Sequence, residues 1–342
     1  MRIAICTTPF VPNIGGIENL SEMTADALGR GGDDVTVLTL QPGGPMPDRA
    51  YRLIRRPSFA AAFAICRGAD AAIMPNIGLK LAPAVLAAGT PLFVWHQHEY
   101  RDPAMPLRKL TPSQQVKRLL IEYRVRANLG CSDFITDRLP DRRPRLTLPN
   151  PYDASLFHID TTVARDRDLV VVGRLVPEKG CDVVLRAMAL PGGPLGTARL
   201  SVVGDGPARG QSEALAMTLG IADRVEFLGA QTGETLRRTL NAHRVMIVPS
   251  VWAEPFGIVA LEGLASGCAM VVSDIGGLPQ AIGACGRTFT PNDPASAAAA
   301  IAAARADPVD PAQPDRVAHL ARHTAEAIAA QLRATIAKFA AR

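Results

Sequence analysis

The feature that most constrains the fold is an alternation of short apolar runs with longer helical patterns. The apolar runs are bounded by Gly, Pro and Asp, which is typical of βαβ units and a parallel sheet. In the first half, strands are predicted at 3–7, 35–40, 71–74 and 92–95, with helices between them, for example at 17–28. A second alternation predicts strands at 168–172, 200–203, 225–228, 245–248 and 270–273. The pattern therefore predicts an α/β fold with two doubly wound, Rossmann-like domains that face a cleft.

A proline-rich break separates the two alternations. The segment 148–153 contains Pro149 and Pro151, and it can continue neither a helix nor a strand. A chain of 342 residues also suits two domains, each with its own core. We therefore predict a first domain over 1–150 and a second over 151–315. Residues 316–342 are rich in Ala, and we expect a C-terminal helix there that packs back on the first domain.

Composition and charge exclude several classes of protein. No apolar run reaches the eighteen or so residues that would span a bilayer, and Met1 leads directly into a predicted strand without a signal peptide, so a cytoplasmic location is expected. The six cysteines are scattered singly, which favours free thiols over disulfides or a metal site. The net charge of +5 is spread along the chain, so an anionic small ligand explains it better than a nucleic acid.

A glycine pair, Gly15 and Gly16, follows the first predicted strand. Two residues without side chains let the backbone approach a ligand at a helix N-terminus, which suits a diphosphate. The spacing is neither GxGxxG nor GxxxxGK[ST], so dehydrogenase and nucleotidase interpretations lose their best support. A tight strand-to-helix turn explains the pair equally well.

Two cations follow the first predicted strand of the second domain. After Gly173, Arg174 leaves the end of the strand and Lys179 opens the next helix, so both can converge on one anionic ligand. Cations aimed at a departing diphosphate would stabilise its developing charge as a metal does elsewhere, and we predict no metal site. The alternative is a pair of solvated basic residues on a loop.

Two carboxylates flank a turn at the start of a later helix. Glu254 follows a predicted strand, Phe256 and Gly257 lie in the turn, and the helix from Ile258 onward carries Glu262. Carboxylates accept hydrogen bonds from sugar or ribose hydroxyls, and free backbone N–H groups donate to sugar or phosphate oxygens. That combination suits a nucleotide sugar, although a capping Glu254 and a surface Glu262 would leave the same pattern.

Further candidates lie after other strands. His96 and His98 follow the strand at 92–95, where an imidazole could face the reacting sugar, and at most one of them is expected to reach it. The pair Gly276 and Gly277 is predicted to line the same cleft. The segment 166–168 spells a DxD motif, but it precedes a strand, so we reject it as a metal site.

One segment carries both basic and apolar residues. The stretch 107–128 contains Arg108, Lys109, Lys117, Arg118, Arg124 and Arg126 among Leu119, Leu120 and Tyr123. Weak peripheral contact with anionic lipid is one interpretation. A solvated helix face is the favoured one.

In this order along the chain, the motifs resemble those of family 4 glycosyltransferases, which are retaining enzymes of the GT-B fold. The resemblance covers nearly the whole chain. Its motifs are Gly15-Gly16-Ile17-Glu18, Leu148-Pro149-Asn150-Pro151, Gly173-Arg174-Leu175-Val176-Pro177-Glu178-Lys179-Gly180, Gly204-Asp205-Gly206-Pro207, and Glu254 and Glu262 with seven residues between them.

The resemblance implies a role for each matching residue of the second domain. Arg174 and Lys179 would hold the diphosphate of the donor, and Glu262 would bind the ribose hydroxyls. Glu254, with the backbone of Phe256 and Gly257, would hold the transferred sugar.

From the first domain, Gly16 would approach the phosphates, and His96 or His98 would contact the sugar. The family needs no metal or other cofactor. It retains the anomeric configuration through an oxocarbenium-like transition state, and we expect the departing diphosphate to take the acceptor's proton. Gln280 departs from the family pattern, which usually has a glutamate there.

The expected donor is a nucleoside diphosphate sugar, UDP-linked in the commonest case, and the expected acceptor is an oligosaccharide or glycoside. Abundant Ala, Arg, Pro and Gly with scarce Lys indicates a GC-rich gene, which favours antibiotic assembly of the orthosomycin (avilamycin) type slightly over polysaccharide, lipopolysaccharide or glycolipid assembly. A sugar-nucleotide epimerase and a non-catalytic nucleotide-sugar-binding protein are the alternatives. Retention of Arg174, Lys179 and both glutamates argues against the non-catalytic protein.

Overall fold

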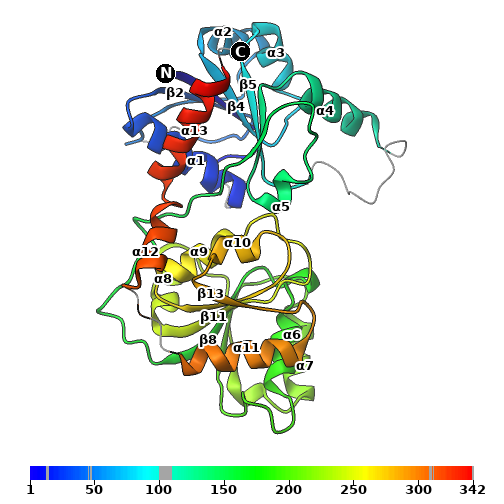
Figure 1. The fold of residues 1–342 in the computed structure, drawn as a ribbon, viewed down its shortest axis with the longest axis vertical. Coiled ribbons are helices and arrows are strands. Elements are labelled where there is room, and N and C mark those ends of the chain that lie inside the picture. Colours follow the sequence, from blue (N-terminus) through cyan, green and yellow to red (C-terminus); the bar gives the residue numbers. More distant parts are fainter. Residues whose placement is uncertain are drawn as a thin grey trace. The chain divides into compact units, whose positions relative to one another are not determined.

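The chain forms two compact units, which we describe one at a time (Figure 1). The structure is a computed structural model, and it describes residues 1–12, 15–44, 46, 48–99, 110–307, 310 and 312–340. The first unit comprises Met1–Pro151 and His323–Arg342, and the second comprises Tyr152–Arg322. Each unit has its own parallel sheet, so the predicted α/β class with two Rossmann-like domains is confirmed.

The first unit is built on a seven-stranded parallel sheet in the order β3-β2-β1-β4-β5-β6-β7. Its inner strands are almost wholly apolar because helices cover both faces. The strands are β1 (Arg2–Thr7), β2 (Asp34–Thr39), β3 (Arg52–Arg55), β4 (Ala71–Pro75), β5 (Leu92–His96), β6 (Ala127–Gly130) and β7 (Arg145–Thr147).

Helices from both ends of the chain cover one face of this sheet. Helix α1 (Gly16–Arg30) packs there beside α13 (Ala325–Phe339), the red helix next to the blue one in Figure 1. Arg333 of α13 binds Asp33, which lies 300 positions earlier in the sequence. The other face is covered by α2 (Phe59–Gly68), α3 (Ala82–Ala88) and the buried side of α4 (Pro112–Tyr123), and α5 (Asp133–Thr136) follows β6.

The second unit repeats the plan with a six-stranded parallel sheet in the order β10-β9-β8-β11-β12-β13. Helices α6, α7 and α11 contribute to a core on one face, and α8, α9, α10 and α12 are its remaining α-helices. The strands are β8 (Arg167–Val172), β9 (Leu200–Val203), β10 (Val225–Gly229), β11 (His243–Val248), β12 (Ala269–Ser273) and β13 (Gly286–Phe289). The helices are α6 (Cys181–Met188), α7 (Arg209–Thr218), α8 (Gly233–Ala242), α9 (Ile258–Ala265), α10 (Leu278–Ile282), α11 (Pro294–Ala306) and α12 (Pro314–Ala321), with short 3₁₀ turns at Pro177–Lys179 and Ala222–Arg224.

The predicted boundary at 315/316 is wrong, because the first C-terminal helix belongs to the second unit. Arg316 of α12 is 2% exposed and donates from Nη2 to the carbonyls of Leu264, in α9, and Cys268, just before β12. His319 Nε2 lies 2.8 Å from the carbonyl oxygen of Ala281. The chain returns to the first unit at His323, and the Thr324 side chain then caps α13 by accepting from Ala327 N.

Several strands were not predicted. Strands β3, β6, β7 and β13 have only three or four residues each, and β3, β7 and β13 contain arginines. Their apolar content is too low to mark them as strands without the neighbours that they pair with. All nine predicted strands are present, each within two residues of its predicted ends.

Candidate active site

Two loops meet where the second sheet reverses its strand order. Strand β8 lies between β9 and β11, and the register pairs Val171 with Ile247, so both strands end at the same edge. The loop after β8 carries Arg174 and Lys179, and the loop after β11 carries Glu254. Val251 N donates to the Glu178 carbonyl over 2.9 Å and joins the two loops directly. Ligands of doubly wound folds bind at such a switch point.

Glycines let these loops approach each other closely. Gly180 has φ +66°, and a Cβ there would lie 2.0 Å from the Pro249 carbonyl oxygen. Gly204 has φ +142°, and a Cβ there would lie 1.8 Å from the carbonyl oxygen of Gly173. Only glycine fits both the backbone angle and the space at these two positions.

An ion pair lies at the centre of this edge. Lys179 Nζ is 2.7 Å from Glu254 Oε1, and the Ser250 hydroxyl donates to the same oxygen. Glu254 is 6% exposed and Ser250 is fully buried, so the carboxylate has a fixed position. No described residue hydrogen-bonds to its second oxygen, which is therefore able to accept from a ligand hydroxyl.

The predicted phosphate-binding residues gather beside this pair. A recess of about 10 Å³ is lined by Gly173, Arg174, Lys179 and Glu254, among others. The Arg174 side chain is exposed and forms no ion pair with any residue that the structure describes. Trp252 is 43% exposed, and its ring centre is 6.0 Å from Lys179 Nζ. The edge thus presents one free guanidinium and one ammonium, which is held by Glu254.

The turn after Glu254 is held by a second loop. Gly257 has φ +102° and precedes α9, while Phe256 is buried. Gly277 N donates to the Glu254 carbonyl over 2.7 Å, and a Cβ on Gly277 would lie 2.4 Å from the Pro255 carbonyl oxygen. The pair Gly276 and Gly277 therefore lies against the backbone of the Glu254 turn. Ile258 begins α9, whose first N–H groups have no partner within the helix.

Glu262 lies farther along α9, in a different environment. Burial is the main reason that its pKa rises to about 7, and the nearby Asp153 carboxylate raises that pKa further. Asp153 itself accepts from Ser155 N, Ser155 Oγ and Leu156 N. The folded chain therefore holds a proton on Glu262 more tightly than water does.

The two candidate histidines belong to the first unit and differ in their surroundings. His96 is 1% exposed and its Nε2 lies 2.9 Å from Asn128 Oδ1; burial lowers its pKa to about 4. His98 is exposed beyond the end of β5, and its Nδ1 lies 2.9 Å from the Glu99 carbonyl oxygen. Gly15 is the N-cap of α1, and Gly16 has open space around its missing Cβ. Asn13 and Ile14, just before them, lie outside the described residues.

Sequence reasoning did not find three polar or aromatic residues of this edge. Ser250 bonds Glu254, Trp252 lies near Lys179, and Asp153 influences Glu262. For Ser250, the only signal that the sequence contains is its place four positions before Glu254. The position of Asp153 near Glu262 depends on tertiary packing alone.

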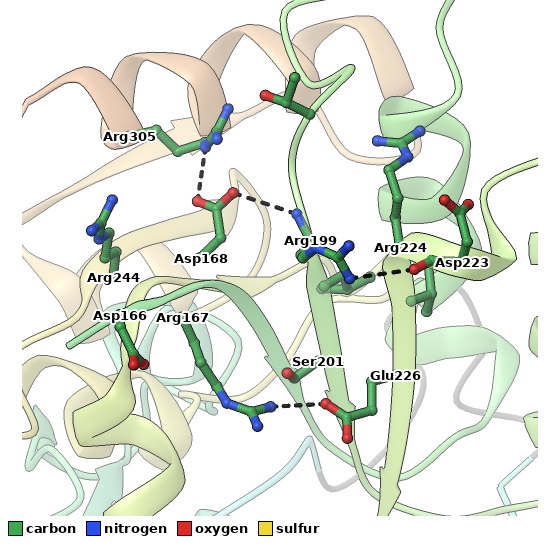
Figure 2. Close-up of a pocket in the computed structure, with 13 residues that line it drawn as sticks. Asp166, Arg167, Asp168, Arg199, Ser201, Asp223, Arg224, Glu226, Arg244 and Arg305 are labelled. Atoms are coloured by element: carbon green, nitrogen blue, oxygen red, sulfur yellow. Dashed lines mark hydrogen bonds and ion pairs between the residues drawn. The ribbon is translucent and has the colours of Figure 1, made fainter. Parts of the chain in front are cut away.

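The Asp166–Asp168 segment lies at the opposite, amino-terminal edge of the second sheet. It lines a cavity of about 490 Å³ with Arg167, Arg199, Arg224, Arg244 and Arg305, among others (Figure 2). Asp168 pairs with Arg305 over 2.8 Å. Within the described ranges, no group of three His, Cys, Asp or Glu residues could hold a metal ion.

Comparison with known proteins adds the family. Residues 158–323 match the family model described as "Glycosyl transferases group 1". An uncharacterized glycosyltransferase of Methanocaldococcus jannaschii is 40% identical over 121 residues, which are 34% of this chain and 30% of that protein. A D-inositol 3-phosphate glycosyltransferase of Mycolicibacterium smegmatis is 35% identical over 198 residues, 53% of this chain and 43% of that protein. The chain thus spans less than half the length of these relatives.

A solved structure matches the whole chain in fold. HepE of Anabaena, crystallised with UDP and glucose, has a TM-score of 0.75 and 17% sequence identity, covering 97% of this chain and 99% of that one. The residues that pair at the β8 and β11 loops all fall inside the segment matched by the family model. The chain therefore has the two Rossmann-like domains of GT-B glycosyltransferases, and its residues 158–323 match group 1 of the glycosyl transferases.

Proposed function

We propose that the protein transfers a sugar from a nucleoside diphosphate donor, UDP-linked, to an acceptor hydroxyl with retention of configuration. The observation that carries the proposal is the Lys179–Glu254 ion pair beside Arg174, at the switch point of a sheet whose sequence matches glycosyl transferases. This arrangement offers two cations to a diphosphate and a carboxylate oxygen to a sugar hydroxyl.

In this proposal the groups of the second unit divide the donor between them. Arg174 and Lys179 hold the diphosphate and stabilise its charge as the glycosidic bond breaks. Glu254 accepts from a hydroxyl of the transferred sugar, the backbone of Phe256 and Gly257 donates to it, and Glu262 accepts from the ribose. The departing diphosphate takes the proton of the acceptor, so no protein base is required.

Among the residues of the first unit, we favour His98 over His96 for the sugar contact. The His96 ring is buried against Asn128 at the sheet, whereas the His98 ring is exposed beyond the strand end. The parts of Gly15, Gly16 and His98 in the site stay predictions.

For the acceptor, we propose an oligosaccharide or glycoside, with antibiotic assembly ahead of cell-surface polysaccharide or glycolipid assembly. The relatives named for D-inositol 3-phosphate make a phosphorylated polyol the second candidate. Measuring transfer from UDP-sugars to panels of both acceptor kinds separates them, since each panel offers a different hydroxyl pattern.

Thermal-shift measurements with UDP, GDP, ADP and dTDP test the donor. A ligand that binds only the folded chain raises its melting temperature, and we expect the largest rise with UDP. An unchanged melting temperature with all four nucleotides would contradict the proposal. Conversion of the donor to an epimer without acceptor would favour the epimerase alternative instead.

A further inference from the structure

A small cavity on the first unit is lined by arginines and no carboxylates. It has a volume of about 110 Å³ and lies where β5 and β6 begin, at the edge opposite to His98. Its cationic lining consists of Arg124, Arg126 and Arg143, and the remaining described lining residues are uncharged. A cavity of this size holds a single phosphate-sized group and not a drug-sized ligand.

The three guanidinium groups are available to an anion. Arg143 Nη2 donates to the Tyr123 carbonyl, which fixes the direction of that side chain and leaves its other N–H groups unused. Among the described residues, no carboxylate pairs with Arg124, Arg126 or Arg143. Guanidinium forks match the geometry of phosphate oxygens.

The large cavity of the second unit is also lined by arginines, so arginines alone do not indicate an anion-binding site. Five arginines line it, but Asp166, Asp168, Asp223 and Glu226 line it too. Figure 2 shows Arg167 paired with Glu226 and Arg305 paired with Asp168, each over 2.8 Å. Its positive charge is therefore largely balanced within the protein, whereas that of the small cavity is not.

An exposed apolar stripe on α4 ends beside the small cavity. Val116, Leu119 and Tyr123 are 47%, 47% and 44% exposed, and their spacing places them on one side of the helix. Ile121, the buried residue of α4, lies on the opposite side. Arg143 of the cavity donates from Nη2 to the carbonyl of Tyr123, the last residue of the stripe, so the stripe and the arginines are continuous.

We propose that this α4 face, defined as Val116, Leu119, Tyr123, Arg124, Arg126 and Arg143, docks the protein on a bilayer that carries anionic phospholipids. A lipid phosphate enters the arginine cavity, and the apolar stripe lies in the headgroup region. Basic residues beside exposed apolar residues are what such a surface attracts. A second copy of the chain would bring the same arginines against these and would be repelled.

Co-sedimentation with vesicles tests the proposal in the full chain. We expect binding to vesicles of equal parts phosphatidylcholine and phosphatidylglycerol, weakening as salt rises, and little binding to phosphatidylcholine alone. The double variant Arg124→Gln/Arg126→Gln should lose about 10-fold or more in affinity, because each basic residue contributes to attraction by the surface. Leu119→Ser should also bind more weakly.

The matched control removes the same charge from the balanced cavity. Arg199→Gln/Arg244→Gln should bind vesicles like the unaltered chain, and unchanged melting temperatures of all variants would show that they fold. Equal losses in the two double variants, or no binding of the unaltered chain to anionic vesicles, would overturn the proposal. A thermal shift with glycerol 3-phosphate that depends on Arg124 and Arg126, without vesicle binding, would assign the cavity to a soluble phosphate. Co-sedimentation measures association with a membrane and does not depend on the proposed transfer reaction.

Discussion

At the scale of single residues, the chemistry depends on how Lys179 is held. Its ammonium is 2.7 Å from Glu254 Oε1, so the cation that we propose for the donor is paired with the carboxylate that we propose for the sugar. The side chains of Lys179 and Glu254 are 25% and 8% exposed, so the ion pair holds both groups in place for a ligand. In the proposed reaction, a donor would have to compete with this pair or bind beside it. The Arg174 guanidinium, which forms no ion pair with a described residue, would be the first cation available to it.

Replacing Lys179 tests this role. We expect Lys179→Ala to lower turnover by about 100-fold or more, because removing one preorganised group that stabilises developing charge typically costs that much. It also leaves Glu254 buried without its cation, so the melting temperature should be measured alongside. Lys338→Ala on the exposed end of α13 is the control and should leave turnover unchanged. Near-normal turnover of Lys179→Ala would contradict the assignment.

Glu262 predicts a pH dependence of stability. Its pKa is about 7 in the folded chain and 4.5 as the ordinary value, so the folded chain holds the proton more tightly. The stabilisation of the folded chain by protonated Glu262 is therefore complete below pH 4.5 and is lost as the pH rises to 7. The difference in melting temperature between the unaltered chain and Glu262→Gln should fall over this range.

Asp153→Asn provides the check on the cause. It removes the carboxylate that raises the pKa of Glu262. The fall in the melting-temperature difference should therefore occur at lower pH. A difference that stays constant from pH 4.5 to 7 would show that Glu262 titrates normally.

At the scale of secondary-structure elements, the site depends on loops that pack backbone against backbone. The Glu254 turn lies between the loop that carries Lys179 and the loop of Gly276 and Gly277. Backbone cannot move aside as the end of a flexible side chain can. The positions of Lys179 and Glu254 should therefore be sensitive to a single added methyl group.

Gly277→Ala tests that sensitivity. Its Cβ would lie 2.4 Å from the Pro255 carbonyl oxygen and 2.8 Å from Phe256 Cα, so the turn must shift. We expect a loss of about 1–3 kcal/mol in the free energy of unfolding, and weaker nucleotide binding. Gly210→Ala, in helix α7 with open space around it, should be neutral or slightly stabilising in both denaturation and binding assays. Equal behaviour of the two variants would mean that the turn is not constrained.

At the scale of the whole molecule, the chain closes the first unit with its own C-terminal helix. Ile328, Leu332 and Ile336 of α13 are buried in the core of that unit, and Arg333 binds Asp33. The first unit is therefore incomplete without α13. Among the described helices, none is long and apolar enough to cross a bilayer.

Leu332→Ala tests the contribution of α13. Loss of a fully buried leucine should cost about 2–5 kcal/mol of unfolding free energy, measured by chemical denaturation. Gln331→Ala, on the exposed side of the same helix, should cost little. Because the proposed nucleotide-binding residues belong to the second unit, UDP should still raise the melting temperature of Leu332→Ala. Loss of that response would show that nucleotide binding depends on α13.

The sequence by itself determined the architecture and the order of the motifs. Short continuous apolar runs and helical patterns of period 3.6 are local properties, and they were sufficient to predict the nine strands that were named. Glycines at strand ends were also informative, because a positive φ or a close backbone contact excludes other residues. The residues proposed for the diphosphate could be named from their places after strand ends.

Only the tertiary structure decided which of these residues touch. Lys179 and Glu254 are 75 positions apart, and their pairing depends on the adjacency of β8 and β11. The ring of buried His96 lies against Asn128 of the neighbouring strand, and Arg316 joins α12 to α9 in the second unit. Such contacts join segments far apart in sequence, and local periodicity contains no information about them.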